Sequence, residues 1–132
     1  MTKPKWSSLL FLCCLTILAY AAPKQKWVKL GARTVNHALD RDEIRVSAKE
    51  GLFQAVQLRV KRREVNFRDV KIHFSNGDVQ DVEMRRDIPA GGETRDIQLA
   101  GSGPRNIEKV VFWYSTAPLR RRRAVVELWG LR

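Results

Sequence analysis

Three clusters of basic side chains carry the clearest chemistry in this sequence, which is the recognition of anions. The clusters comprise Lys61, Arg62 and Arg63; Arg85 and Arg86; and Arg120, Arg121, Arg122 and Arg123. Guanidinium groups match phosphate and carboxylate groups bidentately, and four consecutive arginines repel one another enough to need a reason. We expect the four-arginine run to form an exposed hairpin loop that binds anionic surfaces. The alternative is that these charges only solvate loops.

An acidic cluster offers a second chemistry, metal binding. His37, Asp40, Asp42 and Glu43 lie within seven residues and carry the oxygen and nitrogen ligands that Ca²⁺ or Zn²⁺ prefers. Asp40 and Asp42 also suit a turn, because their side chains accept hydrogen bonds from nearby backbone N–H groups. Arg41 stands between them as a competing cation. We therefore expect a structural turn and no metal site.

Two tryptophans could stack on sugars. Exposed Trp113 and Trp129 would give a carbohydrate-binding surface, whereas buried ones would pack in the core or at a sheet edge, as aromatic side chains of small domains commonly do. We expect packing. If the strands flanking the arginine run form a symmetric hairpin, Trp113 lies near Val125 and Trp129 near Lys109.

The sequence contains no pattern that predicts catalysis. Both cysteines lie in the first 21 residues, and the only histidines are His37 and His73, so a multi-histidine site is excluded. Serines 47, 75, 102 and 115 stand in no context typical of a nucleophile. We expect His73 to be an exposed side chain among charges. We therefore predict that the protein is not an enzyme and has no cofactor.

The elements that must position these residues are short strands. Apolar and polar residues alternate over residues 54–60, 43–48 and 95–99, as in half-buried strands. Residues 107–114 are apolar almost throughout, which predicts a central strand covered on both faces. Residues 124–129 form the last strand. After residue 21, no stretch of about 12 residues has apolar residues at the spacing of an amphipathic helix.

Turn residues separate these strands. Asn76-Gly77 predicts a two-residue hairpin loop, since both central positions of that turn need positive φ. Phe67 and Val70 are three residues apart, which breaks the period of two and predicts a bulge, and Val79 and Val82 show the same spacing. Pro89 and the glycines of residues 88–92 predict a crossing between sheets.

These elements define the fold class. About eight short strands with turn signals every 8 to 12 residues predict one antiparallel β-sandwich, with either an immunoglobulin-like or a jelly-roll topology. About 110 residues suffice for a single core. The sequence predicts one domain over residues 22–132.

The first residues predict export. Lys3 and Lys5 precede an apolar run of 12 residues, and Ala19 and Ala21 suit cleavage before Ala22, so residues 1–21 form a predicted signal peptide rather than a membrane anchor. The remaining chain has 23 basic and 14 acidic residues, a net charge of +9. In the periplasm or at the cell surface, nucleic acid is not an expected partner. Anionic lipid headgroups, anionic glycans or acidic proteins are.

The chain resembles a family of small exported bacterial proteins catalogued only as a domain of unknown function. The positions that carry the resemblance are Leu30-Gly31-Ala32, Val60, residues 70–74, Ile88-Pro89 before Gly-Gly-Glu-Thr, Val110, Phe112 and Glu127-Leu-Trp-Gly130. They cover nearly the whole chain after residue 21. The resemblance implies an export signal and a compact β-domain, and it implies no catalytic residue.

Overall fold

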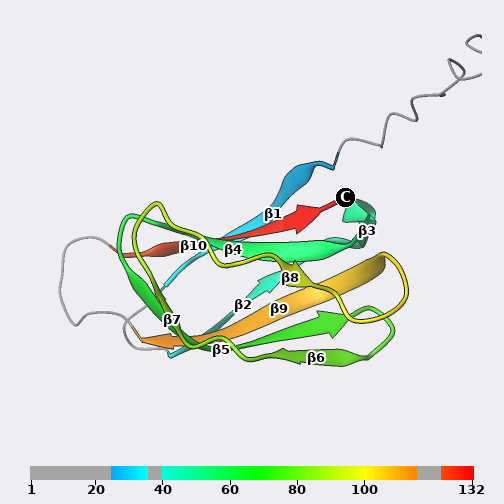
Figure 1. Ribbon diagram of the computed structural model, residues 1–132. Helices are drawn as coiled ribbons and strands as arrows, with labels where there is room; N and C mark the ends of the chain where they lie inside the picture. The colour runs from blue at the N-terminus through cyan, green and yellow to red at the C-terminus, as the bar shows by residue number, and fades with distance from the viewer. Residues whose placement is uncertain (1–24, 36–39, 116–122) are drawn as a thin grey trace, which may run out of the picture.

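Two antiparallel sheets packed face to face make up the protein in the computed structural model, which describes residues 25–35, 40–115 and 123–132 (Figure 1). The four-stranded sheet contains, in order, β1 (Trp27–Thr34), β10 (Val125–Leu131), β4 (Ala55–Lys61) and β8 (Ile97–Gln98). The six-stranded sheet contains β2 (Arg41–Arg45), β9 (Arg105–Ser115), β5 (Val65–Phe74) and β6 (Val79–Val82), with β3 (Leu52–Phe53) paired to β9 and β7 (Arg86–Ile88) paired to β5. The helix in this part of the chain is a 3₁₀ turn, Ala48–Glu50, and no described helix is long and apolar enough to cross a membrane.

The strand order is that of a jelly roll. The connections from β1 to β2, β4 to β5, β7 to β8, β8 to β9 and β9 to β10 all pass from one sheet to the other. Without the short additions β3 and β7, the orders β1-β10-β4-β8 and β2-β9-β5-β6 are those of an eight-stranded sandwich built from two Greek keys. The predicted all-β sandwich is therefore confirmed, and the topology is the jelly roll rather than the immunoglobulin fold.

The β5–β6 hairpin forms where Asn76-Gly77 predicted it, but its loop is longer than predicted. The N–H of Phe74 donates to the carbonyl of Asp78 at 2.9 Å, and the N–H of Gly77 donates to the carbonyl of Phe74 at 3.0 Å. Gly77 has a φ of 94°, whereas Asn76 does not have positive φ. The loop thus has three residues, and the side chain of Asn76 instead accepts a hydrogen bond from the N–H of Asp78 at 3.0 Å.

One of the two predicted bulges is present. The pairing of β5 with β9 shifts register between Phe67 and Asp69, so Arg68 is the extra residue. The predicted slip between Val79 and Val82 is wrong, because β6 pairs with β5 in regular register. Val79 is half exposed at this sheet edge, where no further strand covers it among the described residues. The apolar spacing in β6 therefore reflects an exposed valine and not an extra residue.

The predicted crossing at residues 88–92 is confirmed. The N–H of Gly92 donates to the carbonyl of Pro89 at 2.9 Å, and Gly91 between them has a φ of 85°. This turn takes the chain from β7 in the six-stranded sheet to β8 in the four-stranded sheet. A residue with positive φ is needed there, which glycine adopts without steric cost.

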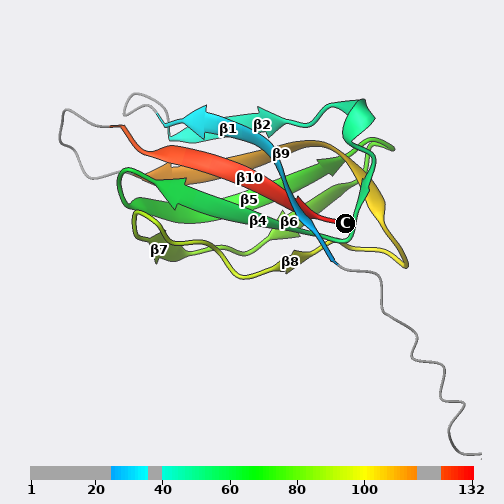
Figure 2. The ribbon, with the colours of Figure 1, turned by 90° about the horizontal axis from the view of Figure 1, so that it is seen from above.

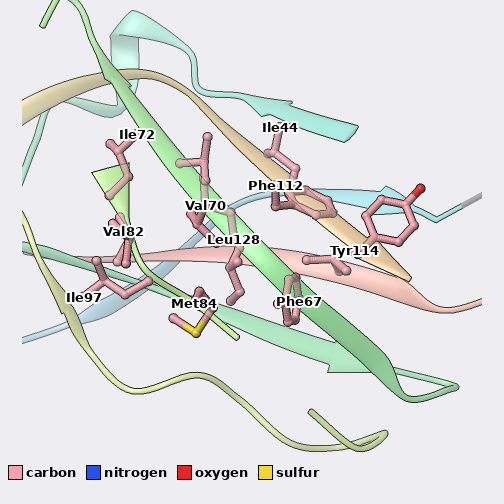
Figure 3. Packing of buried hydrophobic residues seen from close by; sticks show 14 of the residues in the cluster. Ile44, Phe67, Val70, Ile72, Val82, Met84, Ile97, Phe112, Tyr114 and Leu128 are labelled. Carbon is pink, nitrogen blue, oxygen red and sulfur yellow. The ribbon is translucent and has the colours of Figure 1, made fainter. Parts of the chain in front are cut away.

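The core lies between the two sheets and is mostly apolar. Phe67 and Val70 of β5 and Phe112 of β9 face Leu128 of β10, and all four are fully buried (Figure 3). The ring of Phe112 contacts the ring of Phe67 edge-on, with centroids 5.9 Å apart. Aromatic pairs of this kind contribute roughly 0.5–1.5 kcal/mol beyond the area that they bury. Packing alone thus accounts for a domain whose described residues include no cysteine.

Candidate anion-binding site

The loops at the two ends of the sandwich differ in charge. At one end lie the last residues of β1, β4 and β9 and the first residues of β2, β5 and β10, and Figure 2 shows this end of the sheets far from the C-terminus. Lys61 pairs there with Val125, and Asn66 pairs with Ser115. We call it the basic end, because its described residues include Lys61, Arg62, Arg63, Arg68, Arg85, Arg86 and Arg123.

Six of the nine predicted anion-binding residues lie at the basic end. They are Lys61, Arg62, Arg63, Arg85, Arg86 and Arg123, whereas Arg120, Arg121 and Arg122 lie outside the described residues. Arg86 pairs with Phe67, which pairs in turn with Tyr114 near the end of β9. Described residues of three clusters that are far apart in the sequence therefore lie at the same end of the fold.

The predicted hairpin around the arginine run is wrong. Strand β9 pairs with β2, β3 and β5, whereas β10 pairs with β1 and β4 in the opposite sheet. The segment 116–122 therefore joins two sheets rather than two paired strands. In a jelly roll, successive strands cross between layers, so neighbours in the sequence are seldom neighbours in a sheet.

Several cations of the basic end have no ion-pair partner in the described part of the chain. No carboxylate oxygen there lies within 4.0 Å of the side-chain nitrogens of Arg62, Arg68, Arg85, Arg86 or Arg123. All five side chains are exposed. Their N–H donors are therefore available to an anionic ligand. Exposed guanidinium groups contribute little to stability by themselves.

The turn that carries Arg62 is strained. Arg62 has a φ of 71°, the left-handed region that residues with a Cβ adopt at a cost of roughly 1–2 kcal/mol. The N–H of Arg63 donates to the carbonyl of Lys61 at 2.8 Å and closes a three-residue turn around it. Strained residues of this kind are concentrated at binding sites. The turn directs Arg62 into solvent at the tip of the β4–β5 connection.

A hollow of about 600 Å³ opens beside these cations. Its lining includes Asn66, Arg68, Arg85, Arg86, Asp87 and Ser115. Arg68 and Asp69 both point away from the core, between the fully buried Phe67 and Val70, because the bulge adds one residue to β5. Bulges commonly redirect a side chain in this way. The lining of the hollow therefore includes three arginines and one carboxylate, Asp87, whose oxygen already accepts a hydrogen bond from the amide of Asn66.

Arg68 was not among the predicted anion-binding residues. The spacing of Phe67 and Val70 predicted the bulge, but the bulge alone does not show which neighbouring strand its extra side chain will face. The pairing of β7 with β5 supplies that information, because it places Arg86 opposite Phe67 and so brings Arg85 alongside Arg68. Only this long-range pairing makes Arg68 part of a cluster.

The acidic cluster does not converge on one point. Asp42 lies within β2, where it is buried, accepts a hydrogen bond from Nε of Arg33 at 2.8 Å and lies 3.4 Å from the hydroxyl of Tyr114. The next side chain, Glu43, points to the outer face. Its carboxylate pairs with Arg41 at 3.6 Å and with Arg45 at 3.4 Å. The prediction that Asp42 caps a turn is therefore wrong, and one ion could not reach both carboxylates.

His37, the histidine of the acidic cluster, lies outside the described residues. Within the residues that the structure describes, no three His, Cys, Asp or Glu side chains are grouped as metal ligands. His73 is half exposed on the outer face of β5, close to its predicted position among charges. Its register partners are Val79 and Lys109.

The two tryptophans lie on opposite outer faces of the sandwich. Trp113 is half buried in β9 opposite Arg41 and Asp69, and Trp129 is half buried in β10 opposite Lys29 and Gln57. Neither side chain is in the core, and neither lies opposite the residue that a β9–β10 hairpin predicted. The two rings therefore cannot line one sugar-binding site.

A cation lies close over the ring of Trp129, and two cations lie farther from the ring of Trp113. The guanidinium carbon of Arg59 lies 4.0 Å from the centroid of Trp129, and Arg41 and Lys71 each lie 5.7 Å from the centroid of Trp113. Cation–π contacts of this kind contribute roughly 0.5–1 kcal/mol at exposed sites. Long charged side chains thus lie on the outer faces of both sheets, where no further layer of described strands is present. On its outer face, β9 is therefore covered by side chains and not by another sheet.

The fold and the cation cluster define a small all-β domain of the jelly-roll class with a basic end. The chain belongs to the family described as domain of unknown function DUF2541, whose model matches residues 8–130. No curated protein and no solved structure gives a significant match. The predicted resemblance to a family of unknown function is therefore confirmed.

Proposed function

We propose that this protein is an exported, non-enzymatic binding module whose basic end engages anionic components of the cell envelope. The observation that supports this proposal is the distribution of ion pairs. Cations on the outer faces of the sheets mostly meet carboxylates, as Lys29 meets Glu127 at 2.9 Å and Lys71 meets Asp81 at 3.5 Å. Five arginines at the basic end meet none among the described residues, and three of them line a hollow.

The energetics of such a site depend on salt. Each basic residue near an anionic membrane surface contributes roughly 1 kcal/mol, so five unpaired arginines suffice for attachment without a large apolar contact. The attraction falls off within the screening length, which is about 10 Å at 0.1 M salt and about 3 Å at 1 M. Binding through the basic end should therefore weaken strongly as salt is added.

Co-sedimentation with vesicles tests the proposal. The test variant replaces Arg62, Arg85 and Arg86 with Gln, and the matched control replaces Lys26, Lys49 and Arg95, three exposed cations away from the basic end that also form no salt bridge with a described carboxylate. Both variants lose the same net charge. Phosphatidylglycerol vesicles should retain the wild type and the control at about 0.1 M salt and release the test variant.

Three results would contradict the proposal. Equal binding by the two variants would mean that net charge alone is responsible. Binding that is indifferent to salt, or equal binding to phosphatidylcholine vesicles, would mean that the attraction is not electrostatic.

The export part of the proposal rests on residues 1–21, which lie outside the described residues. Intact-mass analysis of the protein from its native host should show a chain that begins at Ala22 with no lipid on Cys13 or Cys14. Retention of residues 1–21, or a diacylglyceryl mass on either cysteine, would contradict it.

A further inference from the structure

Trp113 lies on the same outer face as the hollow and directly beside it. Trp113 and Ser115 are alternate residues of β9, so both point away from the core, and Ser115 lines the hollow. On the neighbouring strand, Asp69 is the register partner of Trp113 and follows Arg68, which also lines the hollow. A half-exposed indole therefore lies two residues along β9 from a hollow whose lining includes three arginines.

The other outer tryptophan provides a comparison. Trp129 is covered by Arg59 at 4.0 Å, and Arg59 is itself held by Glu93 at 3.4 Å and by the side-chain oxygen of Gln57 at 3.0 Å. The cations beside Trp113 are farther from its ring, at 5.7 Å. Of the two rings, Trp113 is thus the one that is less tightly covered and the one that borders a hollow.

We propose that the hollow and Trp113 together form a binding site for a phosphorylated glycan. The phosphate monoester occupies the hollow and accepts hydrogen bonds from Arg68, Arg85 and Ser115, while the sugar ring that carries it stacks on Trp113. This inference rests on the proposed function, and it narrows the anionic partner from any envelope anion to a sugar phosphate.

The chemistry of the hollow favours phosphate over carboxylate. A phosphate monoester carries close to two negative charges and three free oxygens, so it can accept from more than one guanidinium fork at once. A carboxylate has two oxygens and one charge. The lining holds three arginines and one carboxylate, Asp87, which already accepts a hydrogen bond from Asn66. The excess positive charge matches a dianion.

The shape of the hollow favours a glycan over a lipid surface. Its volume of about 600 Å³ suits a ligand of one or two sugar rings, and its lining comes mostly from the ends of the strands β5, β7 and β9 rather than from a loop tip. A bilayer would meet the tips of loops such as that of Arg62 first. A sugar phosphate can instead lie along β9, with its anion and its ring reaching adjacent positions.

Binding to phosphomannan, a mannan that bears phosphate monoesters, tests the inference. The comparison ligand is the same phosphomannan after phosphatase treatment, and phosphatidylglycerol vesicles form the third arm. The hollow variant is R68Q/R85Q, and the matched variant R62Q/R123Q removes two charges from the same end outside the hollow. The hollow variant should lose about tenfold or more in phosphomannan affinity and its preference for the phosphorylated form, whereas R62Q/R123Q should keep that preference.

A tryptophan pair isolates the stacking contact. Trp113→Leu should weaken phosphomannan binding several-fold and leave vesicle binding unchanged, and Trp129→Leu should affect neither. If Trp113→Leu fails to fold, a Trp27→Phe, Trp129→Phe background leaves Trp113 as the only tryptophan of residues 22–132. Its emission should shift when phosphomannan binds and stay constant when vesicles bind.

The outcomes separate this inference from the proposed function. Equal losses in the two double variants, or no emission change of Trp113 on phosphomannan, would overturn the glycan site. If salt-sensitive vesicle binding persisted with no preference for phosphomannan, the partner would be a membrane and the basic end would still be the contact. If the wild type bound neither probe, both proposals would fail.

Discussion

The two ends of the sandwich use the same residue type in different ways. At the end that carries the β5–β6 hairpin and the C-terminus, Arg105 donates to Asp78 at 2.9 Å and to the carbonyl of Ala100 at 2.8 Å, with its guanidinium 3.6 Å from the ring of Phe74. We call it the paired end. At the basic end, Arg85 and Arg86 have no such partners in the described chain.

This difference shows how the neighbours of an arginine decide its role. Where a carboxylate, a carbonyl and a ring face a guanidinium, its donors are used within the fold and it contributes to stability. Where no such group faces the guanidinium, its N–H donors are available to a ligand and the residue contributes little to stability. Substitutions at the paired end should therefore change unfolding, and substitutions at the basic end should change binding.

The largest expected effect is at Gly130, in the paired end. A Cβ there would lie 2.6 Å from Cδ1 of Phe53 and 2.9 Å from Cδ1 of Leu30, so Gly130→Ala overpacks the core and should cost about 1–3 kcal/mol of unfolding free energy. Gly103→Ala is the control, because no atom lies within 4 Å of its Cβ position. Urea unfolding of both variants measures the difference. Equal stabilities would show that the paired end is not tightly packed.

Arg105→Gln should have the next largest effect. It removes the hydrogen bond to Ala100 and the contact with Phe74, and the stability loss should be about 1 kcal/mol, since the exposed Asp78 pair adds little. Arg86→Gln is the matched variant and should change stability by less than about 0.5 kcal/mol. In thermal melts the first should lower Tm and the second should not. The comparison between the ends fails if the two melts coincide.

A smaller effect is expected at Arg62. Glycine adopts its φ of 71° freely, so Arg62→Gly relieves strain but adds unfolded-chain entropy, and stability should stay unchanged or rise by less than about 1 kcal/mol. Arg62→Ala removes the same charge and keeps the strain. Both variants should weaken vesicle binding equally. A glycine variant less stable than the alanine variant in denaturant titrations would rule out strain at this turn.

The smallest effect concerns Glu127 on the outer face of the four-stranded sheet. Its pKa lies below the ordinary value of 4.5, chiefly because Lys29 donates a hydrogen bond to it and further because the indole of Trp129 donates a second, against the raising effect of burial. A lowered folded-state pKa means that the stabilisation is complete above 4.5 and is lost as the pH falls through the lowered value.

The stability difference between wild type and Glu127→Gln should therefore shrink as the pH falls from about 6 to about 3, and it should be under about 1 kcal/mol at its largest, because Lys29 is half exposed. Lys29→Gln should raise the carboxyl titration midpoint of Glu127 in NMR spectra. A difference that does not vary with pH, or an unmoved midpoint, would show that this pair does not couple to folding.

Local patterns predicted the strands and turns of this protein well. The alternation in residues 54–60 became β4, and the spacing of Phe67 and Val70 became a bulge. Such patterns depend on neighbours two or three residues apart, which the sequence contains in full. The Val79 prediction failed because an apolar side chain at a sheet edge has the same spacing as a bulge.

The tryptophans show where local patterns end. Residues 110–114 are all apolar or aromatic, so both sets of alternate residues could face the core. The sequence therefore could not show which set does. The structure buries Phe112 and Tyr114 and turns Trp113 outward. Likewise, Asp42 suited a turn by its type, and only the long-range approach of Arg33 from β1 made it a buried, ion-paired strand residue.

The sequence by itself determined the all-β class, the strand positions, the positive charge and the residue types of an anion site. These follow from residue chemistry and short-range periodicity. The tertiary structure alone decided the jelly-roll order, the placement of β9 and β10 in different sheets, and the meeting of Arg68, Arg85 and Arg86 at one hollow near Trp113. Which strands pair depends on burial summed over the whole chain, and no local window contains that sum.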